Sequence, residues 1–241
     1  MAIELPSEVA WFLNFIGVPW ININEDKVRE FATHVRTFGS SVQDAHQNAS
    51  STLQQMGASY SGSSYEALMS MWGSKSTQHM TELIDGCNVL ATALDGGADF
   101  IEGQKIACIA ELAVMAASFV ADQAAAVVTF GASEALMPVI IEGAEKLMDF
   151  AVQQVEQYVI GQILNAALKP LIDKMGSAVQ GLVLDTESAV LGVGGGGSAG
   201  DAFNVDPDAI EGHAGVIQGH AQTMSAQVST FSSNLRGLSF Q

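Results

Sequence analysis

The chain has 241 residues, and its 9 Lys and Arg against 26 Asp and Glu give a formal net charge of −17. Such a chain lacks the cationic surface that binds nucleic-acid phosphates, and anionic membrane surfaces are disfavoured for the same reason. Since 48% of the residues are hydrophobic and only 15% are charged, general disorder is also excluded. Composition therefore indicates a folded, acidic protein, and we expect its partners to be proteins.

Residues 1–22 do not form a secretory signal peptide. They lack a cationic start and contain Glu4 and Glu8, so we expect any export to use a route other than the general secretory one. The segment instead predicts a short apolar cap that packs on the rest of the chain, through Trp11, Phe12, Phe15, Ile16 and Trp20.

A heptad pattern begins after the helix-starting run Asn24-Glu25-Asp26-Lys27. Apolar residues then alternate at spacings of three and four as far as Met56, which predicts one straight helix of about thirty residues with a narrow apolar stripe. We call the first part of this stripe the seam. Its members are Val28, Phe31, Val35, Phe38 and Val42.

The first helix should end near Gly57, where residues 57–62 have turn chemistry. Ser63 and Ser64 then predict the start of a second helix, whose stripe contains Met69, Trp72, Ser76, Met80, Leu83, Cys87, Leu90 and Leu94. Two helices joined by a tight turn fold back antiparallel to bury their stripes. Residues 23–97 are therefore expected to form a helical hairpin.

Residues 98–190 are expected to form an apolar helical bundle region, separated from the hairpin by a joint at Gly96-Gly97. In its first helix, 19 of the 23 residues from Ile106 to Val128 are hydrophobic. That length could span a bilayer, but two acids within it favour a helix buried in a bundle. The alternative is a membrane-inserting helix that uses Ile106, Val114, Phe119 and Val128. A further helix is predicted from Ser133 to Leu168, then a joint at Pro170 and a weakly amphipathic segment, Leu171–Val190.

Residues 191–204 are expected to be a Gly-rich linker. The run Gly192–Gly200 is not a phosphate-binding loop, because no Lys follows it. Residues 205–241 predict a C-terminal heptad helix that starts at Asp206-Pro207-Asp208, with a stripe at Ile210, Ala214, Ile217, Ala221, Met224, Val228, Phe231, Leu235 and Leu238. This helix either begins a second hairpin or completes the bundle.

No constellation of residues with catalytic, cofactor-binding or metal-binding spacing occurs in the sequence. The five histidines lack the paired spacing of a zinc helix, and Cys87 and Cys108 match no metal or redox motif. We read the two cysteines as buried thiols, with a single disulfide between neighbouring helices as the alternative. The chain is therefore not expected to be an enzyme, unless unrelated positions assemble a site.

The turn Tyr60-Ser61-Gly62 resembles the Trp-x-Gly turn of the WXG superfamily, whose members are helical hairpins exported by type VII (ESX) secretion. The opening is similar to the N-terminal WXG-like domains of large actinobacterial polymorphic toxins of the CpnT type. That likeness lies in Leu5-Pro6, Ile16-Gly17, Pro19-Trp20 and the run from Asn24. The resemblance implies that Tyr60 packs its ring across the turn and that Gly62 permits the tight backbone.

The resemblance implies an all-α, elongated helical bundle built on the hairpin. It also implies a non-catalytic domain that targets an effector for type VII secretion, to the medium or the cell surface, and binds a small WXG heterodimer, another helical partner, a chaperone or the secretion machinery. The seam and Trp72 are the predicted partner surface. One departure is that Tyr60, Tyr65 and Tyr158 are followed four residues later by Ser64, Met69 and Gln162, instead of the acid of the usual export signal. A channel-forming module using residues 106–128 is the alternative function.

Overall fold

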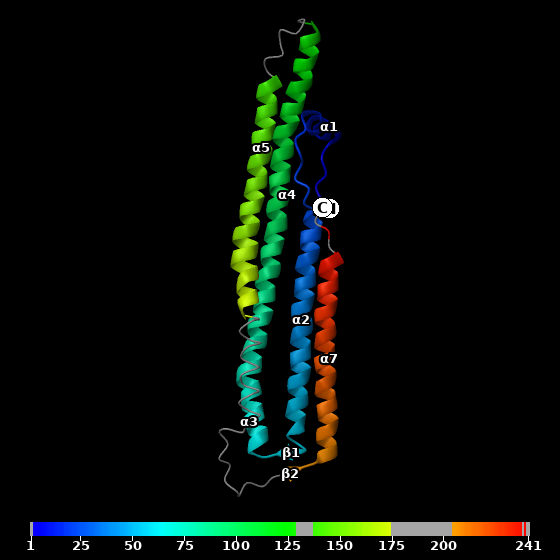
Figure 1. Cartoon of the computed structure of the whole chain (residues 1–241), viewed down its shortest axis with the longest axis vertical. Helices are drawn as coiled ribbons and strands as arrows, with labels where there is room; N and C mark the ends of the chain where they lie inside the picture. Colours follow the sequence, from blue (N-terminus) through cyan, green and yellow to red (C-terminus); the bar gives the residue numbers. More distant parts are fainter. Residues whose placement is uncertain (1, 129–136, 175–203, 238, 240–241) are drawn as a thin grey trace. The chain divides into compact units, whose positions relative to one another are not determined.

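The computed structural model describes residues 2–128, 137–174, 204–237 and 239 (Figure 1). Within these residues the fold is all-α, as expected, apart from one pair of two-residue strands. The chain divides into two units. Unit 1 contains Met1–Glu30, Ala93–Asn165 and Ser239–Gln241, and unit 2 contains Phe31–Thr92 and Ala166–Leu238.

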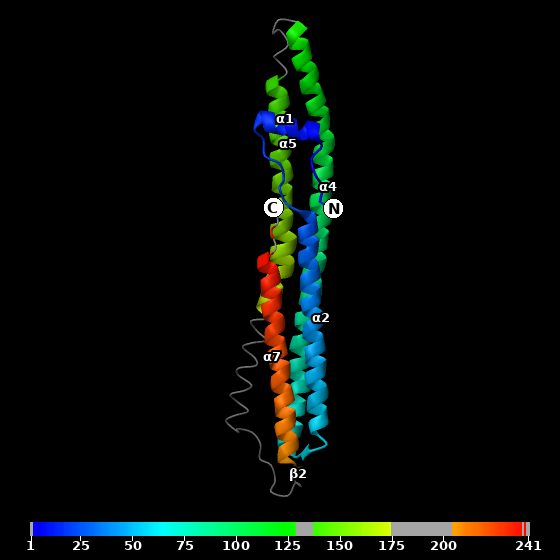
Figure 2. The same ribbon diagram turned by 90° about the vertical axis from the view of Figure 1, so that its right-hand side faces the viewer.

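Unit 1 is built from the short helix α1 (Ser7–Ile16), the start of α2 (Glu25–Met56), the later part of α4 (Thr77–Val128) and α5 (Met137–Tyr158). In both views α4 and α5 run side by side, and Figure 2 shows α1 lying across them. Helix α1 ends because Gly17 adopts a φ of 74°, a left-handed conformation that glycine tolerates best.

The core of unit 1 forms where α1 meets α4 and α5. Phe119 of α4 is fully buried, and its ring centroid lies 5.4 Å from that of Phe12 and 5.2 Å from that of Phe15. The buried members of this core are Val9, Phe12, Leu13, Ile21, Cys108, Leu112, Ala116, Phe119, Ala144, Met148 and Ala151. The N-terminal segment is thus an integral part of the hydrophobic core of this unit.

Unit 2 contains the rest of α2, strand β1 (Tyr60–Ser61), helix α3 (Ser63–Met71), the π-helical segment η1 (Trp72–Ser76) and the first part of α4. The chain reverses at β1, so that α3, η1 and α4 return along α2 as an antiparallel hairpin (Figure 1). The two arms approach closely at Gly39, where an added Cβ would lie 3.1 Å from the Cβ of Cys87.

Helix α7 (Pro207–Gly237) lies beside α2 in unit 2 (Figures 1 and 2). Strand β2 (Asn204–Val205) pairs antiparallel with β1, and the Asp206 N–H donates to the Ser59 carbonyl at 3.0 Å. The Asp206 carboxylate then caps the helix by accepting from the Ala209 N–H at 3.1 Å. Further along, Phe231 stacks on Phe38 with ring centroids 4.7 Å apart.

The structure corrects two predicted joints. Helix α4 continues through Gly96 and Gly97. These glycines allow close packing instead: an added Cβ would lie 2.8 Å from the Tyr158 hydroxyl at Gly96 and 3.0 Å from Ile163 at Gly97. Pro170 lies inside a continuous helical run, because residues 169–174 are α-helical and directly follow the π-helical residues 159–168.

The helix predicted from Ser133 is described from Met137, as α5 followed by the π-helical segment η2 (Val159–Leu168). The run Gly192–Gly200 and most of Leu171–Val190 lie outside the described residues.

Candidate functional site

The turn between the hairpin arms holds two of the predicted site residues, Tyr60 and Gly62. Gly62 precedes α3 with a φ of 148°, a conformation that side chains disfavour. Tyr60 lies in β1, and its ring meets the ring of Tyr65 edge-on at 5.8 Å. The Tyr65 hydroxyl donates to the Leu53 carbonyl at 3.0 Å, close to the end of α2. Tyr65, which the sequence pattern did not assign to the turn, therefore ties the two arms together directly.

Trp72, the predicted site residue of the second arm, lies at the start of η1 and faces α2. Its indole N–H donates to the Ser50 hydroxyl at 2.9 Å, and its ring stacks on His46 at 5.4 Å. Burial lowers the pKa of His46 below its ordinary value of 6.5. Since both polar partners of Trp72 come from the other arm of the same hairpin, this residue cross-links the arms.

The seam predicted to bind a partner is largely part of the chain's own core. Phe31 and Phe38 are partly exposed, and Phe38 is stacked on α7. The other three members expose 6%, 1% and 0% of their surface: Val28, Val35 and Val42. These valines are already packed by the same chain, so they do not form an exposed surface.

The residues predicted for a membrane helix do not share one face of α4. Ile106 and Val114 are exposed by 53% and 67%, whereas Phe119 is fully buried against α1. Val128 is the last residue of α4. Among the described residues, the stretch Tyr65–Ala124 is long and apolar enough to cross a membrane, and 28% of its most apolar window is buried.

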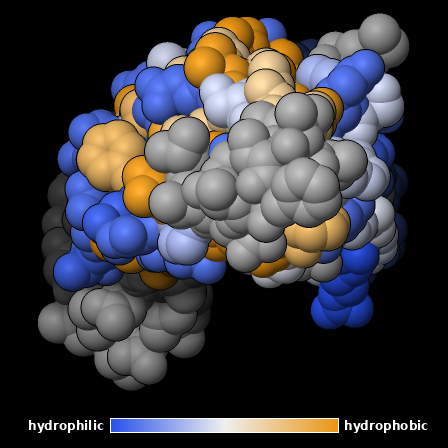
Figure 3. Space-filling model, turned by 90° about the horizontal axis from the view of Figure 1, so that it is seen from above, coloured by the Kyte–Doolittle hydropathy of each residue, from blue (hydrophilic) through white to orange (hydrophobic). Residues whose placement is uncertain are grey.

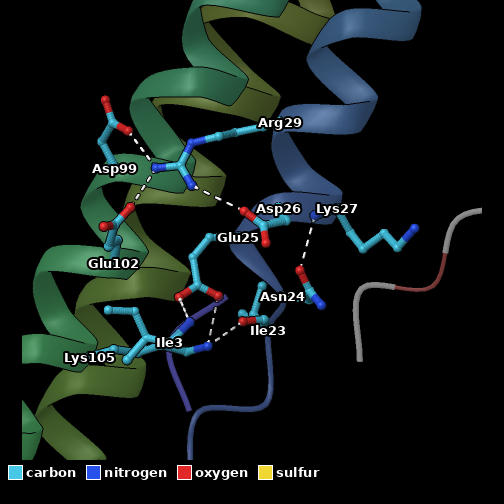
Figure 4. Close-up of polar contacts among 10 residues, drawn as sticks. All are labelled: Ile3, Ile23, Asn24, Glu25, Asp26, Lys27, Arg29, Asp99, Glu102 and Lys105. Carbon is cyan, nitrogen blue, oxygen red and sulfur yellow. Dashed lines mark hydrogen bonds and ion pairs between the residues drawn. The ribbon is translucent and has the colours of Figure 1, made fainter. Parts of the chain in front are cut away.

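A buried polar cluster fastens α2 to α4 in unit 1 (Figure 4). The Lys105 ammonium donates to the Glu25 carboxylate at 2.9 Å and to the Ile23 carbonyl at 2.6 Å. The other Glu25 oxygen accepts from the Ile3 N–H at 3.0 Å. Glu25 and Lys105 are exposed by only 0% and 3%, so this ion pair joins the N-terminal segment, α2 and α4 inside the protein.

The charge balance of the cluster sets the ionisation of Glu25. Burial raises the pKa of this carboxyl. Hydrogen bonds from its own backbone N–H, from Lys105 and from the Ile3 N–H together lower the pKa by more than burial raises it, so the pKa lies below 4.5. Glu25 was predicted only as an acid of the first helical turn. Its pairing with Lys105 was missed because the two residues are 80 positions apart.

Arg29 forms a second, more exposed link in the same unit. Its guanidinium donates to Asp99 at 2.8 Å and to Glu102 at 2.6 Å, and these bonds raise its pKa (Figure 4).

The described residues contain no group of three or more His, Cys, Asp or Glu that could hold a metal ion. Cys87 and Cys108 are free and buried, so the disulfide alternative is not realised.

The sequence model of the WXG100-like domain family matches residues 3–142, which is more than half of the chain. No curated protein and no solved structure matches the chain.

Proposed function

This chain belongs to the WXG100-like domain family of helical, type VII secretion-related proteins, and we propose that it is the secretion-targeting and partner-binding domain of a type VII effector. The observation that carries the proposal is the extent of the family match. Residues 3–142 include α1, the whole hairpin with its turn, and all of α4.

We further propose that the domain belongs to an actinobacterial polymorphic toxin of the CpnT type and has no catalytic activity of its own. The ordered opening, from Leu5-Pro6 to the run at Asn24, supports this assignment. The toxic activity would then reside in a separate domain, and the product would be secreted or displayed on the cell surface.

Export is the first test. The full chain is produced in an actinobacterial host with an intact type VII system and in an isogenic strain without it. We expect the chain in the culture medium of the first strain only, while an intracellular marker protein stays in the cells of both. Equal amounts in the two media would contradict type VII targeting.

Partner binding is the second test. The chain is co-produced with short WXG-family open frames encoded beside its gene, and we expect a stable complex after affinity and size-exclusion chromatography. Acidic substitutions in the seam, such as Val35→Asp, would not probe this interaction, because Val35 is buried and an unpaired carboxylate there would destabilise unit 2. Variants of exposed residues are needed instead.

Membrane insertion is the second candidate function, favoured by the low burial of the apolar window within Tyr65–Ala124. It would require Lys105 and Asp122, both buried in unit 1, to leave their surroundings. Purified full chain is mixed with dye-loaded phosphatidylcholine vesicles. Leakage that is lost in Ala117→Arg, at an exposed position of α4, would support this function, and intact vesicles would refute it.

A further inference from the structure

The solvent side of α4 in unit 1 carries a continuous apolar face. Ile106, Val114 and Val120 are exposed by 53%, 67% and 53%. We define the outer face as these three residues together with the exposed alanines 107, 110, 113, 117, 121 and 124. Residues 106, 110, 113, 117, 120 and 124 alternate at spacings of four and three, which is the pattern of a helix–helix contact.

Helix α1 turns one border of the outer face into a groove. This groove has a volume of about 750 Å³ and is lined by Pro6, Ser7, Glu8, Val9, Trp11, Ala113, Ala116, Ala117 and Val120. Trp11, which is 51% exposed, forms part of its wall, and the alanines keep its α4 side shallow. Viewed from the end of the molecule, orange hydrophobic side chains are exposed among blue hydrophilic ones (Figure 3).

Acidic residues border this apolar surface on both sides. Glu8 of α1 lines the groove and is exposed. On the other side, exposed Glu111 of α4 lies one helical turn from Ala107 and Val114. A helix that covers the surface therefore needs cations on both flanks of its own apolar stripe.

Three kinds of occupant can be compared on these grounds. A second copy would bring its own acidic borders to the contact, and each copy carries a charge of −17. A bilayer gains little from a face that is mostly alanine, and it does not need a heptad spacing. A partner helix matches the heptad spacing, the close approach that alanines allow, and the length of about 27 Å that residues 106–124 span at 1.5 Å per residue.

We propose that the outer face and the α1 groove bind one helix of a small partner protein, whose apolar heptad stripe is flanked on both sides by Lys or Arg. This inference rests on the proposed partner-binding function and names the surface that performs it. It replaces the seam, whose valines are buried in the chain's own core.

The test uses the full chain and the WXG-family protein that co-purifies with it. Ala117→Arg places a cation in the middle of the outer face, and we expect at least a hundredfold loss of affinity in isothermal calorimetry. Ala226→Arg, at an exposed alanine of α7, is the matched control and should bind normally. The double variant Glu8→Gln/Glu111→Gln should bind about tenfold more weakly at low salt, and the difference should shrink at high salt. Unchanged circular dichroism and thermal midpoints establish that the variants remain folded.

A direct readout of burial comes from labelling. Since Cys87 and Cys108 are buried, Ala117→Cys supplies an accessible thiol for an environment-sensitive fluorophore. Because a probe at the centre of the contact would itself weaken binding, Ala124→Cys at the end of the outer face is labelled as well. A blue shift at residue 124 on addition of the partner, with none at a labelled Ala226→Cys, supports the proposal.

The possible failures have different meanings. If the wild-type chain binds no WXG-family protein, the proposed function and this inference fall together. If the complex forms and Ala117→Arg leaves its affinity unchanged, only this inference is overturned. A dimer of the chain alone that Ala117→Arg dissociates would instead identify a second copy as the occupant, and leakage of phosphatidylcholine vesicles that this variant abolishes would identify a bilayer. Either of these last two results would refute the partner helix.

Discussion

Removing the Lys105 ammonium while keeping its length, in Lys105→Met, would leave the Glu25 carboxylate buried without a counterion. Loss of one member of a buried ion pair typically destabilises a protein by about 3–5 kcal/mol. Glu25 would keep the bond from the Ile3 N–H at 3.0 Å, so we expect a value near the lower limit, about 3 kcal/mol. That is a large fraction of the roughly 5–15 kcal/mol by which most domains are stable.

The loss should depend on pH. In the folded wild-type chain the pKa of Glu25 lies below 4.5, its ordinary value in an unfolded chain. The ionised carboxylate therefore contributes its full stabilisation above pH 4.5, and this stabilisation is lost as the pH falls through the pKa of the folded chain. In Lys105→Met a protonated Glu25 needs no counterion. The difference between the two proteins should therefore be larger at pH 7 than at pH 4.

Urea unfolding is followed by tryptophan fluorescence in a Trp72→Phe background, which leaves Trp11 and Trp20, both in unit 1, as reporters. The matched control is Lys146→Met, because Lys146 also pairs with a carboxylate, at 2.6 Å, but is exposed. This control should unfold with the wild-type midpoint. Equal effects of the two variants, or a Lys105→Met effect that is the same at pH 4 and pH 7, would refute the reasoning.

Three further predictions concern helix packing, the turn and the thiols. Gly103→Ala should stabilise the chain by about 0.5–1 kcal/mol, since nothing lies within 4 Å of the added Cβ. Gly39→Val should destabilise the chain by about 1–3 kcal/mol through overpacking, and thermal melting compares the two variants. Tyr65→Phe removes the hydrogen bond to the end of α2, so the free energy of urea unfolding should fall by about 1 kcal/mol. An unchanged midpoint would show that this bond does not stabilise the hairpin. Burial raises the pKa of Cys87 to about 11 and also raises that of Cys108, so a thiol reagent at pH 8 should modify neither in the native chain and both in urea.

The long helical elements could be predicted because their apolar spacing is regular over many turns. The first helix was expected from Asn24 to about Gly57 and is found at Glu25–Met56. Glycine was the less reliable signal. At Gly96 and Gly97 the sequence suggests a helix break. In the structure the missing side chains make room for Tyr158 and Ile163, and only the fold shows that these two residues are neighbours of the glycines.

Which apolar stripes are buried within the chain could not be predicted, because an apolar stripe does not say what covers it. Helix α7 illustrates the point: Ala214, Ala221 and Val228 of its predicted stripe are exposed, while His213 and His220 are more buried. The His220 ring lies 3.3 Å from the Thr52 hydroxyl of α2. The helix is rotated toward its polar flank because polar contacts, which periodicity ignores, help to determine how it sits.

Helix α7 can cover α2 only late in synthesis. Its contacts with α2 join residues far apart in the chain: Thr52 and His220 are separated by 168 positions, and His34 and Asn234 by 200. At roughly 5–20 residues per second, a ribosome needs about 10–40 s to extend the chain over that distance. Throughout this interval the side of α2 that α7 will cover is open, and the nascent protein is available to any helix that binds there first.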